Sequence, residues 1–215
     1  KLILINAAVG AQPIRSLLPD GEIIATQNGI NEYDNLVAAV LEAIRVFGAS
    51  NINSVSVIWL HSERTGNELS QSNSDNAAIF ERFQEYFSDL VYLREQLLVD
   101  LGIPKLWFFI NRVGIVETPF SQRFASILND LGYWQIELAR VNDLFLPLSI
   151  LPRTFSVTQG TLSDDALHYS SIGYNNLGAE NATNWDLFME GNDISNLIYG
   201  DNDLYLPSIV VEQPF

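Results

Sequence analysis

The chain has 215 residues, 47% of them hydrophobic and 17% charged, so it can bury a core of its own and does not have a disordered composition. Its 26 acidic and 11 basic residues give a net charge of −15, which argues against a nucleic-acid partner because phosphate binding needs clustered Lys and Arg. The absence of cysteine excludes disulfides, cysteine-ligated zinc and a cysteine nucleophile. No apolar run approaches the roughly 18 residues of a membrane span, so we expect no membrane partner.

The first part of the chain predicts strands alternating with a helix. Leu2–Ala7 is a short apolar run typical of a buried parallel strand. Apolar residues in Tyr33–Phe47 recur with a helical period, and Gly48 suits the C-terminal cap of that helix. Val55–Leu60 predicts a second buried strand. The polar segment Glu63–Asp75, rich in Ser and Asn, is predicted to be a loop.

The alternation continues in the second part. Asn76–Leu101 carries an apolar face with a helical period, and Lys105–Ile110 is a third apolar strand. Ser121–Val141 predicts a helix that is broken or bent at its internal glycine. Leu144–Val157 should contain a last strand, and Gly173–Ala182 a closing helix.

This order predicts an α/β fold, a three-layer sandwich with a mainly parallel sheet. We expect one α/β domain over residues 1–182, followed by an irregular extension or connector over residues 183–215. The chain opens directly in a predicted strand without a lead-in, which suggests a piece cut from a longer polypeptide.

The pattern that carries the most chemistry is Asp165 followed three residues later by His168. A histidine can take a proton from a serine nucleophile, while a carboxylate beside it holds the imidazole in the right tautomer. The pair therefore predicts the base half of a hydrolytic triad. Asp164 is the weaker partner by spacing, and Asp165 can also cap a short helix around His168. The alternative is that His168 is an ordinary loop residue without a catalytic role.

Three polar segments are predicted at the carboxyl ends of strands, where parallel sheets carry their active sites. They are Val9–Gln12, Trp59–Glu63 and Asp165–Gly178, the last with a glycine-bearing turn and a helical pattern after its histidine. In these segments the chain resembles the SGNH/GDSL hydrolase superfamily, particularly its sialate O-acetylesterase-like carbohydrate-esterase branch. That branch has a glycine block, which Asn6–Pro19 resembles, then Trp-x-Gln-Gly-Glu, and finally Asp-x-x-His before a Gly-x-x-x-Leu-Gly helix. The resemblance spans roughly residues 1 to 182.

The departures from the family pattern are equally informative. His61 stands at the position of the family's oxyanion glutamine, and Ser62 at that of its glycine. The family's Gly-Gln-Ser-Asn nucleophile block is missing. Ser72 lies in a Ser-Gln-Ser-Asn segment that partly resembles this block, but in the middle of a predicted loop after the wrong strand. A second segment resembles the family's Gly-Asp-Ser-Leu form, but Asn202 stands at the position of the serine.

The resemblance implies a serine-type O-acetylesterase that removes acetyl groups from a polysaccharide and needs no cofactor. In it His168 is the general base, Asp165 orients His168, and the Gly10 N–H and His61 stabilise the oxyanion, with Glu63 beside them. The family places the serine on the central first strand, so we expect both to precede Lys1 or to come from another chain. The partner would be an acetylated glycan and the setting extracellular or a virion, such as a phage tail; a homo-oligomer is left open.

Each assignment has an alternative. His61 and Glu63 can belong to a solvated loop, and Gly10 can be only a tight-turn glycine. A metal site is not favoured, because the two histidines lie on distant segments and there is no cysteine. The alternative function is a catalytically inactive SGNH-like domain with a glycan-binding or structural role, which the His61-Ser62 pair favours.

Overall fold

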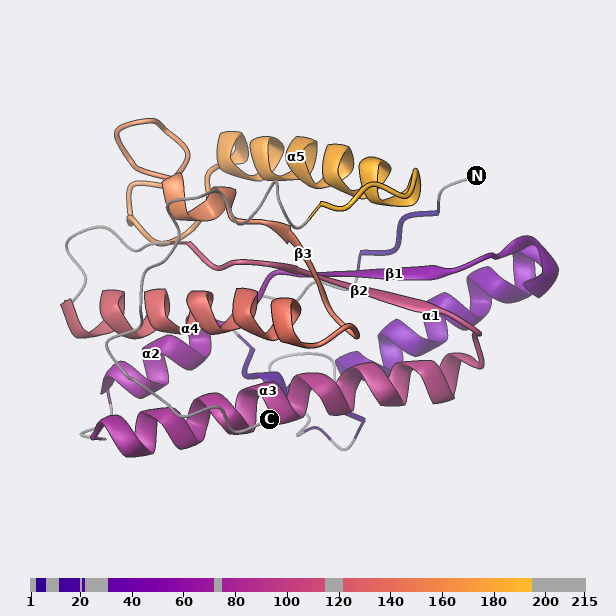
Figure 1. The fold of residues 1–215 in the computed structure, drawn as a ribbon, viewed down its shortest axis with the longest axis horizontal. Coiled ribbons are helices and arrows are strands. Elements are labelled where there is room, and N and C mark those ends of the chain that lie inside the picture. Colours follow the sequence, from indigo (N-terminus) through magenta and orange to yellow (C-terminus); the bar gives the residue numbers. More distant parts are fainter. Residues whose placement is uncertain are drawn as a thin grey trace. The chain divides into compact units, whose positions relative to one another are not determined.

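The computed structural model describes residues 3–6, 12–19, 21, 31–71, 75–114 and 122–194. These residues form an α/β fold with five α-helices and a three-stranded sheet of order β1-β2-β3 (Figure 1). Strands β2 and β3 are parallel, and Phe109 pairs with Leu146 before a bulge shifts the register at Asn111. The elements are η1 Ile14–Leu17, α1 Glu32–Phe47, η2 Ala49–Asn51, β1 Val55–Trp59, α2 Glu63–Gln71, α3 Asn76–Leu101, β2 Leu106–Asn111, α4 Gln122–Val141, β3 Leu146–Ser149, η3 Leu151–Thr154 and α5 Ser171–Met189.

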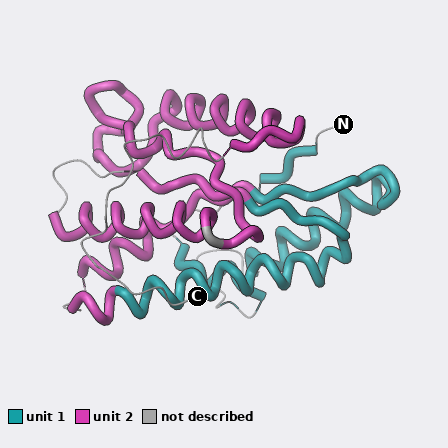
Figure 2. The backbone as a smooth tube through the Cα atoms, viewed as in Figure 1, with its two compact units in different colours: residues 1–57, 80–108 teal, residues 58–79, 109–215 magenta. Residues whose placement is uncertain are grey.

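The chain divides into two compact units, which are described separately (Figure 2). Unit 1 comprises residues 1–57 and 80–108, and unit 2 comprises residues 58–79 and 109–215. All the predicted site residues except Gly10 fall in unit 2.

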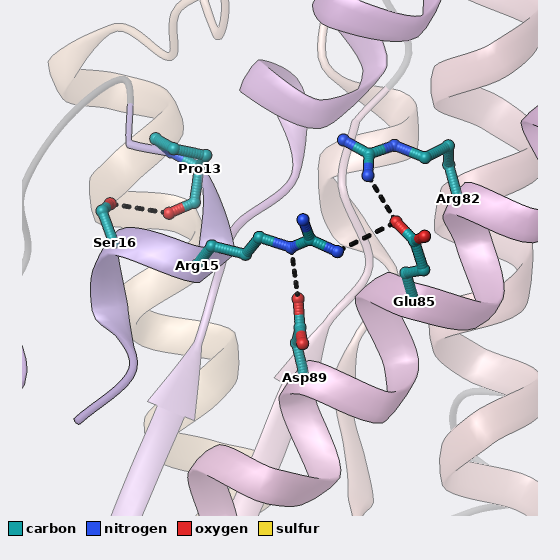
Figure 3. Close-up of polar contacts among 6 residues, drawn as sticks. All are labelled: Pro13, Arg15, Ser16, Arg82, Glu85 and Asp89. Atoms are coloured by element: carbon teal, nitrogen blue, oxygen red, sulfur yellow. Dashed lines mark hydrogen bonds and ion pairs between the residues drawn. The ribbon is translucent and has the colours of Figure 1, made fainter. Parts of the chain in front are cut away.

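Unit 1 is held by caps and by contacts to α3. The Asn31 side chain accepts a hydrogen bond of 2.7 Å from the Tyr33 N–H and so begins α1, while Gly48, at φ 84°, ends it. The Tyr33 hydroxyl donates to Asp100 of α3 at 2.7 Å. Arg15, on η1, reaches Glu85 at 3.1 Å and Asp89 at 3.5 Å, both on α3 (Figure 3).

Two predicted strands differ from expectation. Leu2–Ala7 was expected to be a buried strand, but its described residues, Ile3–Asn6, form no strand and are exposed, with Leu4 83% exposed. The predicted strand Val55–Leu60 is confirmed as β1, yet Ile58 is 51% exposed. β1 lies at the end of the described sheet. An apolar run indicates strand propensity, not whether another element covers its side chains.

Unit 2 packs helices against β3. Figure 1 shows α4 and α5 on opposite sides of this strand, whose Leu148 is fully buried. The helix α4 runs unbroken through Gly132, where a break or bend was predicted. A Cβ at Gly132 would lie 3.2 Å from Cγ2 of Val113 and 3.1 Å from the Arg112 side chain, so the glycine serves close packing against the segment after β2.

The predicted loop Glu63–Asp75 is wrong over most of its length, because residues 63–71 form α2. Its contact with α4 needs little apolar surface. A Cβ at Gly66 would stand 3.3 Å from the Phe124 ring and 3.2 Å from Leu128, and only Leu69 adds a buried apolar side chain. The helix therefore has only one large apolar residue on its buried face, and its polar composition is typical of a loop.

The remaining elements agree with the sequence pattern. Helices α1, α3 and α4 and strands β2 and β3 lie within the predicted segments or within a residue or two of their ends. The closing helix α5 is longer than expected and continues through residues 183–189, which were assigned to the irregular tail. Residues 195–215 lie outside the described part of the chain.

Candidate active site

The structure brings Asp165 and His168 into direct contact. Nδ1 of His168 lies 2.5 Å from Oδ2 of Asp165. The other carboxylate oxygen accepts the backbone N–H groups of Leu167 at 3.1 Å and of His168 at 3.0 Å. Asp165 thus orients the ring and caps the turn that carries it, the two roles that the sequence allowed together.

The charge of Asp165 is strongly favoured. The hydrogen bond from the His168 ring, helped by the backbone N–H groups of His168 and Leu167, lowers the pKa of Asp165 to about 2. Both side chains remain accessible, with 71% of His168 and 48% of Asp165 exposed. No described residue hydrogen-bonds Nε2 of His168. The imidazole is therefore fixed on one side and open to solvent on the other.

A tightly closed loop presents His168. The His168 carbonyl accepts the Ser163 N–H at 2.8 Å, and Ser170 caps α5 by accepting the Gly173 N–H at 3.2 Å. A Cβ at Gly173 would stand only 2.2 Å from the Thr161 carbonyl oxygen, so this helix turn can pack there only with glycine. The glycine of the Asp-x-x-His block thus has a steric role in placing the histidine loop.

The segment after β1 carries His61, Ser62 and Glu63. The His61 ring lies against Trp59, with ring centroids 5.1 Å apart. Ser62 is fully buried with φ 147°, and its carbonyl accepts the Gly66 N–H at 2.9 Å, which starts α2. Such a φ favours glycine, the residue that the family block has there.

Glu63 lies within electrostatic reach of His168. Burial raises the pKa of Glu63, and hydrogen bonds from the Glu63 and Ser62 backbone, together with the charge of His168, act in the opposite direction. The carboxylate of Glu63 also contributes to the raised pKa of Tyr169, whose first cause is burial. Leu60, the residue after β1, packs against the buried cluster that contains Tyr169, so the segment after β1 and the histidine loop lie together.

The nucleophile and one oxyanion donor stay predictions. Gly10, Ser72 and Asn202 lie outside the described residues. The Ser62 hydroxyl, fully buried and within 3.2 Å of the Gln135 side-chain nitrogen, is closed to a substrate. Within the described ranges no group of three or more His, Asp or Glu side chains is arranged to hold a metal ion. Among the described helices none has the length and apolarity to cross a membrane.

Two residues of this region were not identified as functional from the sequence. Gln135 reads as a surface position of a helix, yet it is fully buried and hydrogen-bonds the segments after β1 and β2. Tyr169 follows His168, and its hydroxyl accepts the Gly114 N–H at 3.1 Å. No feature of the sequence around Gln135 indicates that its side chain is buried and hydrogen-bonded. Tyr169 could have been identified as a candidate because it directly follows His168.

Comparisons with known proteins give no assignment: no family model, no curated protein and no solved structure matches this chain. The resemblance to SGNH hydrolases therefore depends on the sequence motifs alone. The contact between Asp165 and His168 is an observation of the structure and does not depend on that resemblance.

Proposed function

We propose that unit 2 carries the general-base half of an SGNH-type serine esterase site that removes O-acetyl groups from a polysaccharide. The observation that carries this is the 2.5 Å contact between Asp165 and an imidazole whose other face is open to solvent. A carboxylate that stays ionised far below neutral pH is suited to hold Nδ1–H and to stabilise the imidazolium formed in catalysis.

The proposed reaction begins with proton transfer from a serine hydroxyl to Nε2 of His168 as the oxygen attacks the acetyl carbonyl. The imidazolium then gives this proton to the departing sugar oxygen, which leaves the acetyl group on the serine. His168 next takes a proton from a water that attacks the acetyl-serine, and gives it back to the serine oxygen as acetate leaves. Asp165 and, at longer range, Glu63 supply the negative charge that stabilises the imidazolium. His61 and Gly10 are the proposed oxyanion donors. The serine comes from a segment or chain outside the described residues, and the reaction needs no cofactor.

The three-layer sandwich belongs to the same proposal. Its support is the packing of α4 and α5 on opposite sides of β3 (Figure 1). A polysaccharide substrate implies an extracellular protein or one carried on a virion.

The test uses the natural protein that contains this chain. A fluorophosphonate probe should label one serine, and His168→Ala should lower both labelling and aryl-acetate hydrolysis by a factor on the order of 10³ because the serine loses its base. Asp165→Asn should also be impaired, and Asp164→Asn is its matched control, since Asp164 is not the ring partner. His61→Ala should cost less, on the order of 10¹ to 10³. Full activity in His168→Ala would refute the proposal.

A second function is favoured by one departure. His61 and Ser62 replace Gln-Gly, and the Ser62 side chain is buried. These features favour an inactive SGNH-like domain that binds a glycan or has a structural role. Absence of labelling and hydrolysis in the natural protein, together with retention on an immobilised acetylated polysaccharide, would support the binding domain over the esterase.

A further inference from the structure

Gln135 of α4 joins two loops of unit 2. Its side-chain oxygen accepts the Val113 N–H at 3.0 Å, in the segment that follows β2. Its side-chain nitrogen donates to the His61 carbonyl at 2.7 Å and lies 3.2 Å from the Ser62 hydroxyl. Gln135 is fully buried, so no water can replace these partners without opening the packing.

Tyr169 joins the same segment to the histidine loop. Its hydroxyl accepts the N–H of Gly114, the residue after Val113, at 3.1 Å. Its ring is 8% exposed and packs edge-on against Phe155, with centroids 5.1 Å apart. A Cβ at Gly114 would lie 3.2 Å from this hydroxyl and 2.8 Å from the Pro152 carbonyl oxygen, so the approach depends on glycine.

The two side chains therefore bind consecutive backbone N–H groups. Gln135, which also hydrogen-bonds His61 and Ser62, accepts the Val113 N–H. Tyr169, the neighbour of His168, accepts the Gly114 N–H. Ser62 keeps a φ of 147°, an unfavourable conformation for serine that persists only where the surroundings impose it. The hydrogen bonds of Gln135 to the His61 carbonyl and the Ser62 hydroxyl, together with the Gly66 N–H on the Ser62 carbonyl, hold this conformation.

From this arrangement we infer that Gln135 and Tyr169 are positioning residues, a brace that couples the His61–Glu63 segment to the His168 loop through Val113 and Gly114. A change at either end of the brace is transmitted to the other. The coupling does not depend on esterase activity; if the esterase proposal holds, the brace sets His61 and Glu63 against the general base.

The two histidines are ideal reporters, because the chain has no others and one lies at each end of the brace. Each imidazole has one Cε1–H group, so the Cε1–H region of a ¹H–¹³C NMR spectrum holds two peaks, one for each histidine. Gln135→Leu should shift or broaden the His168 peak as well as that of His61. Tyr169→Phe, which removes one hydroxyl, should do the same to the His61 peak as well as that of His168.

Matched controls separate this coupling from a general loss of packing. Asn184→Leu removes another buried amide, whose hydrogen bond goes to the Leu148 carbonyl of β3 at 2.7 Å. Tyr174→Phe removes a neighbouring hydroxyl that has no hydrogen bond within the described residues. Both variants should leave the His61 peak unchanged.

The brace is refuted if Gln135→Leu affects only His61 and Tyr169→Phe affects only His168. Tyr169→Phe alone decides the question if Gln135→Leu does not fold. In an active protein, Tyr169→Phe should also lower kcat at nearly unchanged KM, since it touches no substrate. NMR coupling without any hydrolysis would keep the brace and reject the esterase, which separates the two outcomes.

Discussion

At Ser62 the backbone conformation favours glycine, whereas the side-chain hydrogen bond favours serine. Its φ of 147° favours glycine, while its hydroxyl lies within 3.2 Å of the Gln135 nitrogen. Strain of this kind costs on the order of 1–3 kcal/mol, comparable to the hydrogen bond that serine gains. The cost of the backbone strain and the gain from the hydrogen bond therefore nearly cancel.

The strain at Ser62 predicts that glycine is more stable than alanine at this position, the reverse of the usual order. Ser62→Gly should be more stable than Ser62→Ala by about 1–2 kcal/mol, because both lose the hydroxyl and only alanine keeps the strain. The measurement is the free energy of unfolding in urea. At Ser171, the exposed first residue of α5, the usual order should hold and alanine should be favoured. The same order at both positions would show that position 62 is not strained.

Glu63 makes stability depend on pH in a defined direction. Burial raises its pKa in the folded protein above the ordinary 4.5, so its contribution to stability is full below that value and is lost as pH rises through the folded pKa. Glu63→Gln keeps an acceptor for the backbone N–H groups and removes the half-buried charge. Its melting temperature should exceed that of the wild type at pH 7 and equal it at pH 4. A lower melting temperature at pH 7 would mean that attraction to His168 outweighs burial.

At the scale of elements, α5 buries Leu177 in its first half but a polar face, with Asn181 and Asn184, in its second half. Asn184 donates to the Leu148 carbonyl, and the Ser149 hydroxyl donates to Glu180. Asn181 is 8% exposed, yet its side-chain oxygen has no hydrogen-bond partner, and both side-chain atoms of the fully buried Asn111 also lack one within the described residues. An unpaired buried polar atom is unfavourable, so this contact is not optimised for stability.

Two neighbouring asparagines of α5 should therefore respond oppositely. Asn181→Leu removes an unpaired oxygen and should raise the free energy of unfolding by about 1 kcal/mol. Asn184→Leu removes the buried hydrogen bond to the Leu148 carbonyl and should lower it by about 1–3 kcal/mol. Thermal unfolding of the two variants gives the comparison. Destabilisation by both would indicate that Asn181 has a partner in solution.

The polar face also explains what the sequence could predict. Helices α1 and α3 and strand β2 carry apolar periods set by their own burial, and each was predicted nearly to its ends. Helix α2 buries only Gly66 and Leu69, and the second half of α5 buries Asn181 and Asn184, so neither segment shows a run of large apolar residues at helical spacing. For the site, spacing predicted the contact between Asp165 and His168. The role of Gln135 depends on contacts more than 70 residues apart, which no local pattern reports.

For the whole molecule, the dominant electrostatic fact is an excess of negative charge. The chain has 11 basic and 26 acidic residues. Several of the described arginines, such as Arg45, Arg64 and Arg140, form ion pairs with glutamates. These pairs lie at the surface, with Glu137 the least exposed partner, and a surface pair typically stabilises by only about 0.2–1 kcal/mol. The unpaired carboxylates repel one another over longer distances, which favours the unfolded chain.

Salt should therefore stabilise this protein. Raising NaCl from about 0.01 M to 0.15 M shortens the screening length from about 30 Å to about 8 Å, which removes repulsion between distant carboxylates more than attraction within contact pairs. The melting temperature should rise by about 2–4 °C for each 1 kcal/mol of repulsion relieved. Sucrose of equal osmolality is the control, since it does not screen charge. A fall in melting temperature with NaCl would show that the contact pairs contribute more than the net charge of −15 opposes.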